Sequence, residues 1–226
     1  MIRKADMTLI PQARRVYANS ANVAGRLRRY CGIESLPLYH PPPQADGYKW
    51  HEDGDFLLVP GRVNALKRQE LVIEALRLTR QPVRVCFIGA ADEAAYAERV
   101  RQVADRLPGG RTIWLGQVPD AKKLLLYGSC LGVIVPPIDE DYGYVTLEAM
   151  LSSKPVITCS DSGGPLEFVS HAETGLVCEP DAPSLARAMD AMWENRSKAK
   201  RMGRSGRARY DALGLSWSRV VETLLA

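Results

Sequence analysis

Six short apolar runs alternate along the chain with segments of helical character. Each is too short for a core helix and indicates a buried strand; the runs cover residues 55–59, 83–89, 112–116, 131–135, 155–159 and 174–178. Strands that are apolar on both faces and alternate with helices are typical of a parallel sheet covered on both sides. We therefore predict an α/β fold with a Rossmann-like, doubly wound parallel sheet. Ligands bind such sheets beyond the carboxyl ends of the strands, where the loops that begin at Gly61, Gly89, Gly116, Pro136 and Asp161 would meet.

The loop after the fourth run contains two glutamates around the start of a predicted helix. Two prolines end the strand, an acidic loop with Glu140 follows, and helical spacing that includes Glu148 begins after Gly143. The first turn of a helix has backbone N–H groups without intrahelical acceptors and a partial positive charge, so it can hold a phosphate. The glutamates would then bind hydroxyl groups on either side. The predicted phosphate-binding backbone is that of Gly143, Tyr144, Val145 and Thr146.

The composition is that of a globular chain. Of the 226 residues, 46% are hydrophobic and 25% are charged, and the net charge is +4. No apolar run is long enough to span a bilayer and residues 1–15 are too charged for a secretory signal, so we expect a cytoplasmic protein. The five cysteines have no CxxC spacing and the three histidines have no metal-ligand spacing. The sequence therefore indicates neither a disulfide framework nor a metal site.

A run of basic residues near the C-terminus raises the question of an anionic partner. Residues 196–209 contain seven arginines and lysines and no acidic residue. Gly203 and Gly206 interrupt this run, and no aromatic residues are interleaved with it, as grooves for single-stranded nucleic acid require. We expect a solvated helix face and no nucleic-acid partner. Peripheral contact with the cytoplasmic face of a membrane is the alternative.

The motifs around the two glutamates resemble a known enzyme family. The pattern Glu140-x-Tyr142-Gly143 is followed by Glu148-Ala149-Met150, by KPVITCSDSGGPLEFV at residues 154–169 and by ETGLVCEP at residues 173–180. Together they resemble the C-terminal, donor-binding half of retaining GT-B glycosyltransferases of family 4, the glycosyl transferases group 1. Residues 60–76 and 17–43 are similar to upstream parts of that family, so the resemblance covers nearly the whole chain.

The resemblance implies a role for each candidate residue. Arg62 and Lys67 would neutralise the donor diphosphate and stabilise the leaving group, and Glu140 would bind hydroxyls of the donor sugar; these three are the candidate catalytic residues. Glu148 would accept hydrogen bonds from ribose hydroxyls. Val118 follows the third strand, where relatives read the base through backbone groups. The remaining candidate donor-binding residues are Gly61, Gly143, Tyr144, Val145 and Thr146.

Each assignment has a structural alternative. A lone arginine and lysine in a loop are usually solvated, Glu148 could serve as a favourable charge near a helix N-terminus, and Glu140 could be a solvated loop acid. The register of all four with the downstream motif favours the functional roles. His40, which precedes three prolines, is expected to be a linker residue.

The chain divides at this proline tract. Residues 1–43 are expected to be the remnant of an N-terminal domain and a crossover linker, with a helix after Ser20 as its cap. Residues 44–226 would form the nucleotide-sugar-binding domain, and a last helix at 216–226 would pack back toward the N-terminal domain. So small an N-terminal piece has little core of its own. We therefore expect that the N-terminal acceptor domain is missing from this chain.

The resemblance implies a hexosyltransferase. The intact enzyme would move a hexose from a UDP-, GDP- or ADP-linked sugar to an acceptor hydroxyl with retention of configuration, in polysaccharide or glycolipid synthesis, and would require no metal or other cofactor. This fragment alone would be inactive. A non-catalytic nucleotide-sugar-binding or partner-docking module stays open, as does a GT-B sugar-nucleotide epimerase, although the spacing of Glu140 and Glu148 argues against the epimerase.

Overall fold

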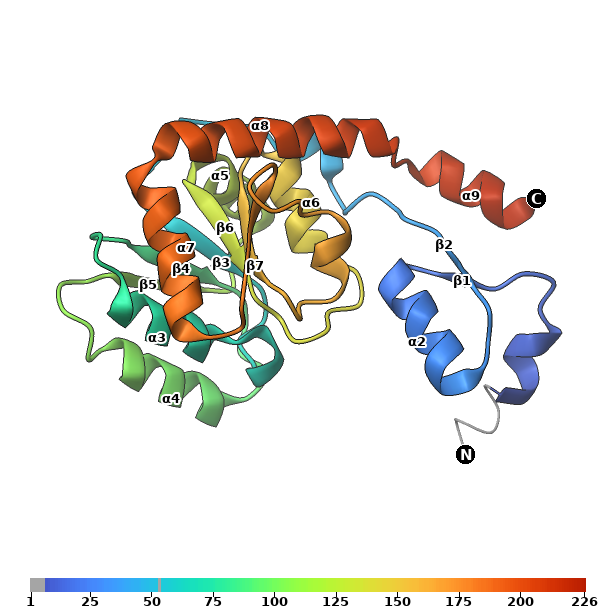
Figure 1. Ribbon diagram of the computed structural model, residues 1–226, viewed down its shortest axis with the longest axis horizontal. Coiled ribbons are helices and arrows are strands. Elements are labelled where there is room, and N and C mark those ends of the chain that lie inside the picture. Colours follow the sequence, from blue (N-terminus) through green and yellow to red (C-terminus); the bar gives the residue numbers. More distant parts are fainter. Residues whose placement is uncertain (1–6, 53) are drawn as a thin grey trace.

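The computed structural model describes residues 7–52 and 54–226, and its main body is built on a six-stranded sheet (Figure 1). The strands are β3 (Leu57–Pro60), β4 (Val85–Ile88), β5 (Thr112–Gly116), β6 (Gly132–Val135), β7 (Val156–Cys159) and β8 (Gly175–Cys178). All are parallel, in the order β5-β4-β3-β6-β7-β8. The six predicted strands are confirmed, with ends shifted by one or two residues. The order reverses between β3 and β6, where doubly wound sheets bind their ligands.

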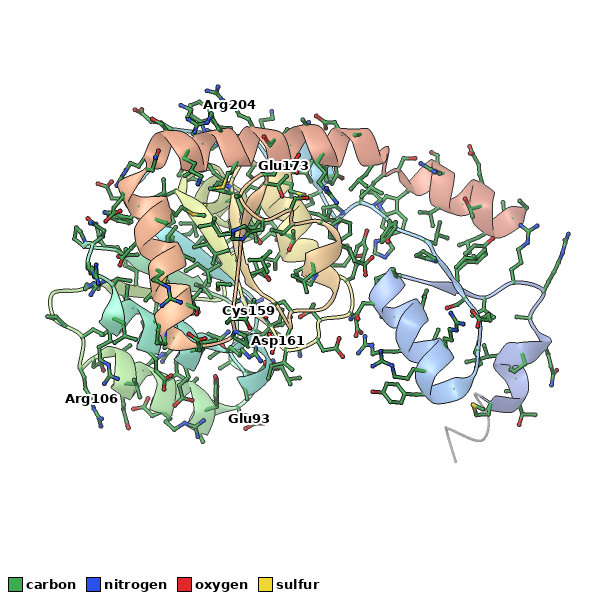
Figure 2. The ribbon with its side chains drawn as sticks, in the orientation of Figure 1. Glu93, Arg106, Cys159, Asp161, Glu173 and Arg204 are labelled. Carbon is green, nitrogen blue, oxygen red and sulfur yellow. The ribbon has the colours of Figure 1, made fainter. Side chains whose placement is uncertain are left out.

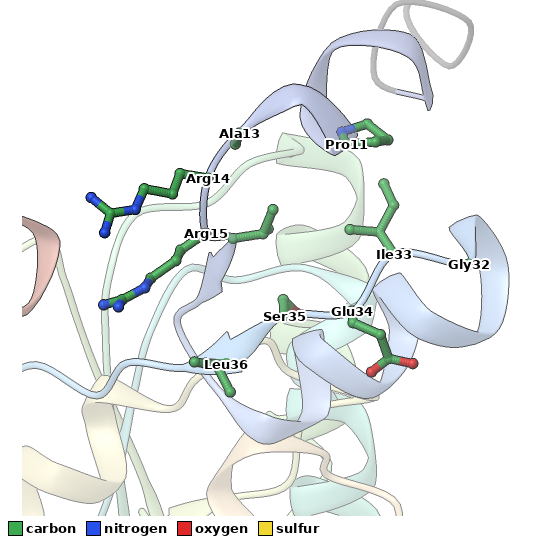
Figure 3. A pocket seen from close by; sticks show the side chains of 10 residues that line it. Pro11, Ala13, Arg14, Arg15, Gly32, Ile33, Glu34, Ser35 and Leu36 are labelled. Atoms are coloured by element: carbon green, nitrogen blue, oxygen red, sulfur yellow. The ribbon is translucent and has the colours of Figure 1, made fainter. Parts of the chain in front are cut away.

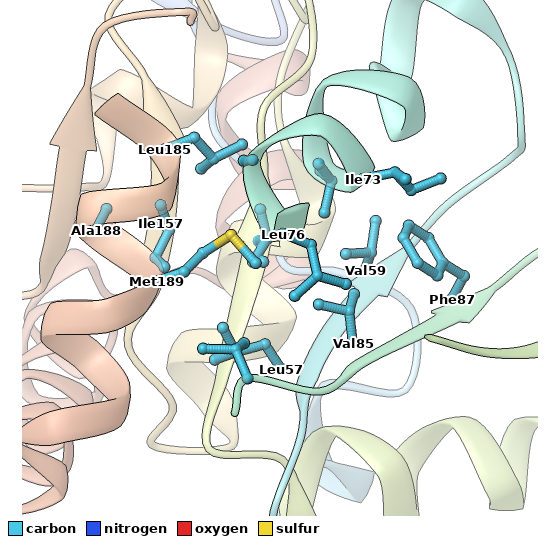
Figure 4. Close-up of a cluster of buried hydrophobic side chains, with 14 of the residues drawn as sticks. Leu57, Val59, Ile73, Leu76, Val85, Phe87, Ile157, Leu185, Ala188 and Met189 are labelled. Atoms are coloured by element: carbon cyan, nitrogen blue, oxygen red, sulfur yellow. The ribbon is translucent and has the colours of Figure 1, made fainter. Parts of the chain in front are cut away.

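Helices cover both faces of the sheet, and alternate residues of a strand enter opposite cores. On one face Leu57 and Val59 pack with α3 (Gln69–Leu78), α4 (Ala94–Ala104) and α7 (Ala182–Glu194) (Figure 4). On the other face Leu58 packs with α5 (Asp120–Ser129), α6 (Tyr144–Leu151) and the end of α8 (Arg196–Leu213). The four inner strands are almost wholly buried, whereas β5 and part of β8 at the edges are half-buried. This burial explains why the inner strands are almost entirely apolar; the polar exception, Thr158 in β7, donates its hydroxyl to the carbonyl O of Val135 at 2.6 Å.

The N-terminal segment forms a small separate layer beside the main body (Figure 1). It contains the short turn η1 (Ile10–Gln12) and a two-stranded parallel sheet of β1 (Tyr17–Ala18) and β2 (Leu36–Pro37), joined by α2 (Ala21–Cys31). The cap predicted at Ser20 is confirmed, because its Oγ accepts a hydrogen bond from the backbone N of Val23 at 3.0 Å. The turn η2 (Ala45–Gly47) leads into the main body. Residues 1–6 of the predicted segment 1–43 lie outside the described residues.

A hollow of about 410 Å³ opens within this segment (Figure 3). Residues 11–16 form one wall and residues 32–36 the other. None of its lining residues is a predicted site residue, and all of them precede the first strand of the main sheet. The hollow therefore belongs to the N-terminal segment.

The last helix, α9 (Trp217–Leu225), lies beside the N-terminal segment (Figure 1). The Tyr17 hydroxyl donates a hydrogen bond to the carbonyl O of Thr223 at 3.4 Å, and the Trp217 ring stacks on His40 with centroids 5.3 Å apart. His40 is thus an aromatic contact and not a plain linker residue, because it also lies against the rings of Tyr142 and Tyr144. Burial lowers the pKa of His40.

The basic run lies on α8, which continues without a break through Gly203 and Gly206. The two glycines are buried and serve packing. A Cβ at Gly203 would lie 2.1 Å from the carbonyl O of Ser153, so α8 approaches the turn after α6 closely. On the outer face Lys198, Arg201 and Arg204 are exposed, and Figure 2 shows Arg204 pointing away from the body. Within the described residues, no helix is both long and apolar enough to cross a bilayer.

Candidate functional site

The loops after β3 and β4 approach each other closely at the carboxyl edge of the sheet. Gly61 and Gly89 both have positive φ angles, of 135° and 132°. A Cβ at Gly89 would lie 2.0 Å from the carbonyl O of Gly61, a separation that no side chain tolerates. Glycine at position 89 therefore allows the two loops to lie directly against each other.

A cavity of about 240 Å³ lies at this edge. The loops after β3, β4 and β5 and the helices α5 and α6 contribute its walls. Five of the ten predicted site residues line it: Gly61, Arg62, Val118, Val145 and Glu148. Gly89, which begins one of the loops expected at this edge, and Gln117, which precedes Val118, also line it. The sequence prediction missed the other lining residues, namely Pro60, Ile88, Lys123 and Tyr127.

Glu148 is the buried carboxylate of this cavity, with only 7% of the residue exposed. It accepts hydrogen bonds from the Tyr127 hydroxyl at 2.5 Å and from Lys123 Nζ at 3.2 Å. Burial, together with the charge of Glu148, raises the pKa of Tyr127 well above its ordinary value, so the phenol stays a donor. A buried carboxylate that accepts two hydrogen bonds and lines a cavity is suited to bind the hydroxyl groups of a ligand.

Lys123 and Tyr127 carry no signal of this role in the sequence. They lie one turn apart on α5 and face Glu148 of α6, 25 and 21 residues further along the chain. Tyr127 also meets the ring of Tyr48 edge-to-face at 5.4 Å, as an ordinary core tyrosine would. Only the packing of α5 against α6 reveals the contact.

The start of α6, where phosphate binding was predicted, has no side-chain cap. Gly143 is the N-cap residue, has φ 97° and provides no side-chain cap. The backbone N of Thr146 already donates to the carbonyl O of Gly143 at 2.9 Å. The amide of Thr146, for which we predicted phosphate binding, is thus hydrogen-bonded within the helix. The amides of Tyr144 and Val145 belong to the first turn, where no intrahelical acceptor exists. The Tyr144 hydroxyl turns toward His40, 3.1 Å from Nδ1.

Lys67 and Glu140 meet outside that cavity. Lys67 ends the turn η3 (Ala65–Lys67), and its Nζ forms an ion pair with the Glu140 carboxylate; 26% and 28% of the two side chains are exposed. The sequence placed both residues in the site but did not foresee their pairing. The contact links the loop after β3 to the loop after β6 across the point where the strand order reverses.

The residue after Lys67 forms a second ion pair. Arg68, at φ 55°, holds Asp161 with two parallel hydrogen bonds of 2.7 and 2.5 Å. The hydrogen bonds from Arg68 lower the pKa of Asp161, and those to Asp161 raise the pKa of Arg68. Figure 2 shows Asp161 beside Cys159 at the end of β7. The sequence singled out the loop of Asp161 but missed Arg68.

Arg62 lies at the rim of the cavity. Its side chain is 69% exposed, and Nη1 lies 3.1 Å from Oδ2 of Asp92. Asn64 also donates to Asp92, at 2.7 Å. A diphosphate at this rim would compete with Asp92 for the guanidinium. Among the described residues, no group of three or more histidine, cysteine, aspartate or glutamate side chains could hold a metal ion.

The family model described as glycosyl transferases group 1 matches residues 44–209. The chain belongs to this family. Among its relatives, the human alpha-1,3/1,6-mannosyltransferase ALG2 is 35% identical over 68% of this chain and 40% of that protein. The D-rhamnosyltransferase WbpZ of Pseudomonas aeruginosa is 31% identical over 70% of this chain and 41% of that protein. The chain thus spans less than half the length of these two glycosyltransferases.

Solved structures agree on the fold of this glycosyltransferase chain. A crystal structure of Anabaena HepE in complex with UDP and glucose matches 98% of this chain and 66% of that one, with a TM-score of 0.83 and 23% identity. Sucrose-phosphate synthase from Thermosynechococcus elongatus matches 98% of this chain and 59% of that one, with a TM-score of 0.85 and 23% identity. The predicted Rossmann-like, GT-B type fold is confirmed.

Proposed function

We propose that this chain is the donor-binding half of a retaining, family 4 glycosyltransferase that moves a hexose from a nucleotide-diphosphate sugar to an acceptor hydroxyl. The observation that carries the proposal is Glu148, a buried carboxylate between Tyr127 and Lys123 that lines a cavity at the switch point of the sheet. The glycosyltransferase relatives and the UDP bound to the Anabaena structure support it.

Different residues of the site bind different parts of the donor. Glu148 accepts hydrogen bonds from the ribose hydroxyls, and the backbone near Val118 contacts the base. The amides of Tyr144 and Val145 at the start of α6 bind phosphate oxygens, where the helix dipole favours a negative charge. Glu140 binds hydroxyls of the sugar.

Catalysis in this proposal is electrostatic. Charge builds on the diphosphate as the bond to the sugar breaks, and Arg62, Lys67 and the start of α6 offset it. In this structure both cations are paired with carboxylates, Arg62 with Asp92 and Lys67 with Glu140. Donor binding therefore exchanges one anionic partner for another, and Glu140 is released toward the sugar. Because this chain spans only part of its relatives, we expect donor binding but little transfer from it alone.

Calorimetric titration with UDP, GDP and ADP tests the proposal. One nucleotide should bind, and Glu148→Gln should weaken it by roughly tenfold, because a charged acceptor of two hydroxyl groups is lost. Glu74→Gln, which changes an exposed carboxylate on α3, is the matched control and should leave affinity unchanged. Equal affinity in the parent and Glu148→Gln would contradict the ribose assignment.

A partner-docking module is the second candidate, because α9 carries apolar side chains that this chain leaves open. Trp217, Val221 and Leu224 are 51%, 51% and 57% exposed, and only Val220 of that helix is buried. A docking module would bind its partner without any nucleotide. Failure of all three nucleotides to bind, both to this chain and after addition of an N-terminal half from a relative, would favour it.

A further inference from the structure

The start of α2 is bound to the loop that contains Glu140. The Nδ2 of Asn22 donates to the backbone O of Glu140 at 3.0 Å and to Oδ1 of Asp139 at 2.8 Å. One turn further along, Arg26 forms an ion pair with Asp141 and lies 3.6 Å from Oδ2 of Asp139. All of these contacts join residues more than a hundred positions apart in the chain.

A second loop holds the same helix start from the other side. Glu167, in the turn η4 (Gly164–Glu167), accepts hydrogen bonds from the backbone N of Ala21 at 3.0 Å and of Asn22 at 2.8 Å. A carboxylate is stabilising there, because the first amides of a helix lack acceptors and carry partial positive charge. The Tyr39 hydroxyl donates to the same carboxylate at 2.6 Å, and burial and this contact raise the pKa of Tyr39 to about 12.

Between these two anchors the backbone around Glu140 is fixed. The backbone N of Glu140 donates to the carbonyl O of Ser162 at 3.0 Å, and its own carbonyl accepts from Gly164 at 2.8 Å as well as from Asn22. A Cβ on Gly163 would lie 2.7 Å both from Asn22 Nδ2 and from the carbonyl O of Glu140. This three-way junction leaves the peptide no room to turn, so it sets the direction in which the Glu140 side chain leaves the loop.

We propose that Asn22 and Arg26 of α2 are positioning residues that aim Glu140 at the sugar of the donor. They act through the backbone of residues 139–141 and do not touch the donor themselves. The N-terminal segment is then more than a remnant, since it helps the main domain to recognise the sugar. This inference rests on the proposed function, and specifically on Glu140 as the residue that binds the sugar.

The experiment measures how much the sugar adds to nucleotide binding. Calorimetry gives the affinities of UDP and UDP-glucose, GDP and GDP-mannose, and ADP and ADP-glucose, and the ratio within the pair that binds is the sugar increment. Asn22→Ala and Arg26→Ala should each lower the sugar increment, by about 5- to 10-fold for Asn22→Ala, and leave the affinity of the bare nucleotide within about twofold. A substitution that merely loosened the fold would weaken both ligands alike.

The matched control lies on the same helix. Arg28→Ala removes an arginine that forms an exposed ion pair with Glu34 at 3.1 Å, and it should change neither affinity. Asn22→Asp, nearly the same size as asparagine, removes the donor to Glu140 and should reproduce the loss if Asn22→Ala fails to fold. Thermal unfolding of each variant confirms that it is folded.

The outcomes separate this inference from the proposed function. Loss of the increment in Glu140→Ala but not in Asn22→Ala or Asn22→Asp would overturn the positioning role and leave the proposed function standing. A parent chain that binds a nucleotide but gains nothing from the sugar would overturn the sugar-binding role of Glu140 and the inference with it. A parent chain that binds no nucleotide would contradict the proposed function itself.

Discussion

Lys67 and Glu140 form an ion pair that links the loop after β3 to the loop after β6, where the order of the sheet reverses. The two side chains come from opposite halves of the sheet. Each is about three-quarters shielded from solvent, so the pair is neither a free surface contact nor a fully buried one. A cation held by a carboxylate at the carboxyl edge of a parallel sheet is available to an anionic ligand that offers more contacts.

Lys67→Met should weaken nucleotide diphosphate binding far more than it weakens the fold. Loss of a charged hydrogen bond to phosphate predicts about a 10- to 100-fold rise in Kd, while loss of a partly exposed ion pair costs about 1 kcal/mol or less of unfolding free energy. Calorimetry and urea unfolding measure the two quantities. Lys122→Met, on the exposed side of α5, is the control and should leave Kd unchanged. A Kd for Lys67→Met equal to that of the parent would exclude Lys67 from the phosphate site.

Arg68 lies in the left-handed region, which glycine tolerates and other residues occupy at a cost. Arg68→Ala removes the hydrogen bonds to Asp161 and keeps the strained backbone, whereas Arg68→Gly removes the same bonds and relieves the strain. We expect Arg68→Gly to be more stable than Arg68→Ala by about 1 kcal/mol. Urea unfolding of both variants measures the difference, and equal midpoints would show that the φ of 55° carries no penalty.

Asp161 makes part of the stability depend on pH. Its folded-state pKa is depressed by the hydrogen bonds from Arg68, so its contribution is present above the unfolded pKa of about 3.9 and is lost as pH falls through the folded value. Asp161→Asn lacks this titration. The stability gap between the parent and Asp161→Asn should therefore be widest near neutral pH and shrink below about pH 4. Urea unfolding at several pH values between 2 and 7 provides the measurement; a constant gap would contradict it.

A central strand of this sheet is buried on both faces, so nearly all of its residues are apolar. The sequence predicts the sheet because such short apolar runs can be recognised in it. Leu57, Leu58 and Val59 alternate between the two cores, and all three are almost wholly buried. It also predicts the backbone elements of the site, since Gly61 and the start of α6 lie where strands end. In α8, by contrast, the close packing of Gly203 could not be predicted, because it depends on the turn at Ser153, fifty residues upstream.

The contacts that complete the site could not be predicted, because tertiary folding alone brings them together. Tyr127 has the sequence context of a core residue, and Asn22 that of a polar residue in the first turn of a helix. Their roles depend on Glu148 and Glu140, which lie 21 and 118 positions away. Periodicity reports which face of an element is buried, but it carries no information about which polar groups meet across two elements.

Replacement by alanine should have opposite effects on the free energy of unfolding at Gly89 and at Gly25. Together the two substitutions test the close approach of the loops after β3 and β4. Gly89→Ala places a Cβ 2.0 Å from the carbonyl O of Gly61 at a residue with φ 132°, and should cost more than about 3 kcal/mol of unfolding free energy or prevent folding. Gly25, inside α2, has nothing within 4 Å of its Cβ position, so Gly25→Ala should raise the unfolding free energy by about 0.5 to 1 kcal/mol through helix propensity.

Urea unfolding of the parent and both variants measures the two effects, and Gly25→Ala shows that a methyl group is tolerated where space exists. A Gly89→Ala protein as stable as the parent would mean that the two loops can separate at little cost. The backbone at Gly61 would then be mobile, and the cavity beside Glu148 would have to form on ligand binding. Severe destabilisation instead supports an edge whose backbone is already in place for the donor, because a preformed site avoids the cost of ordering its loops.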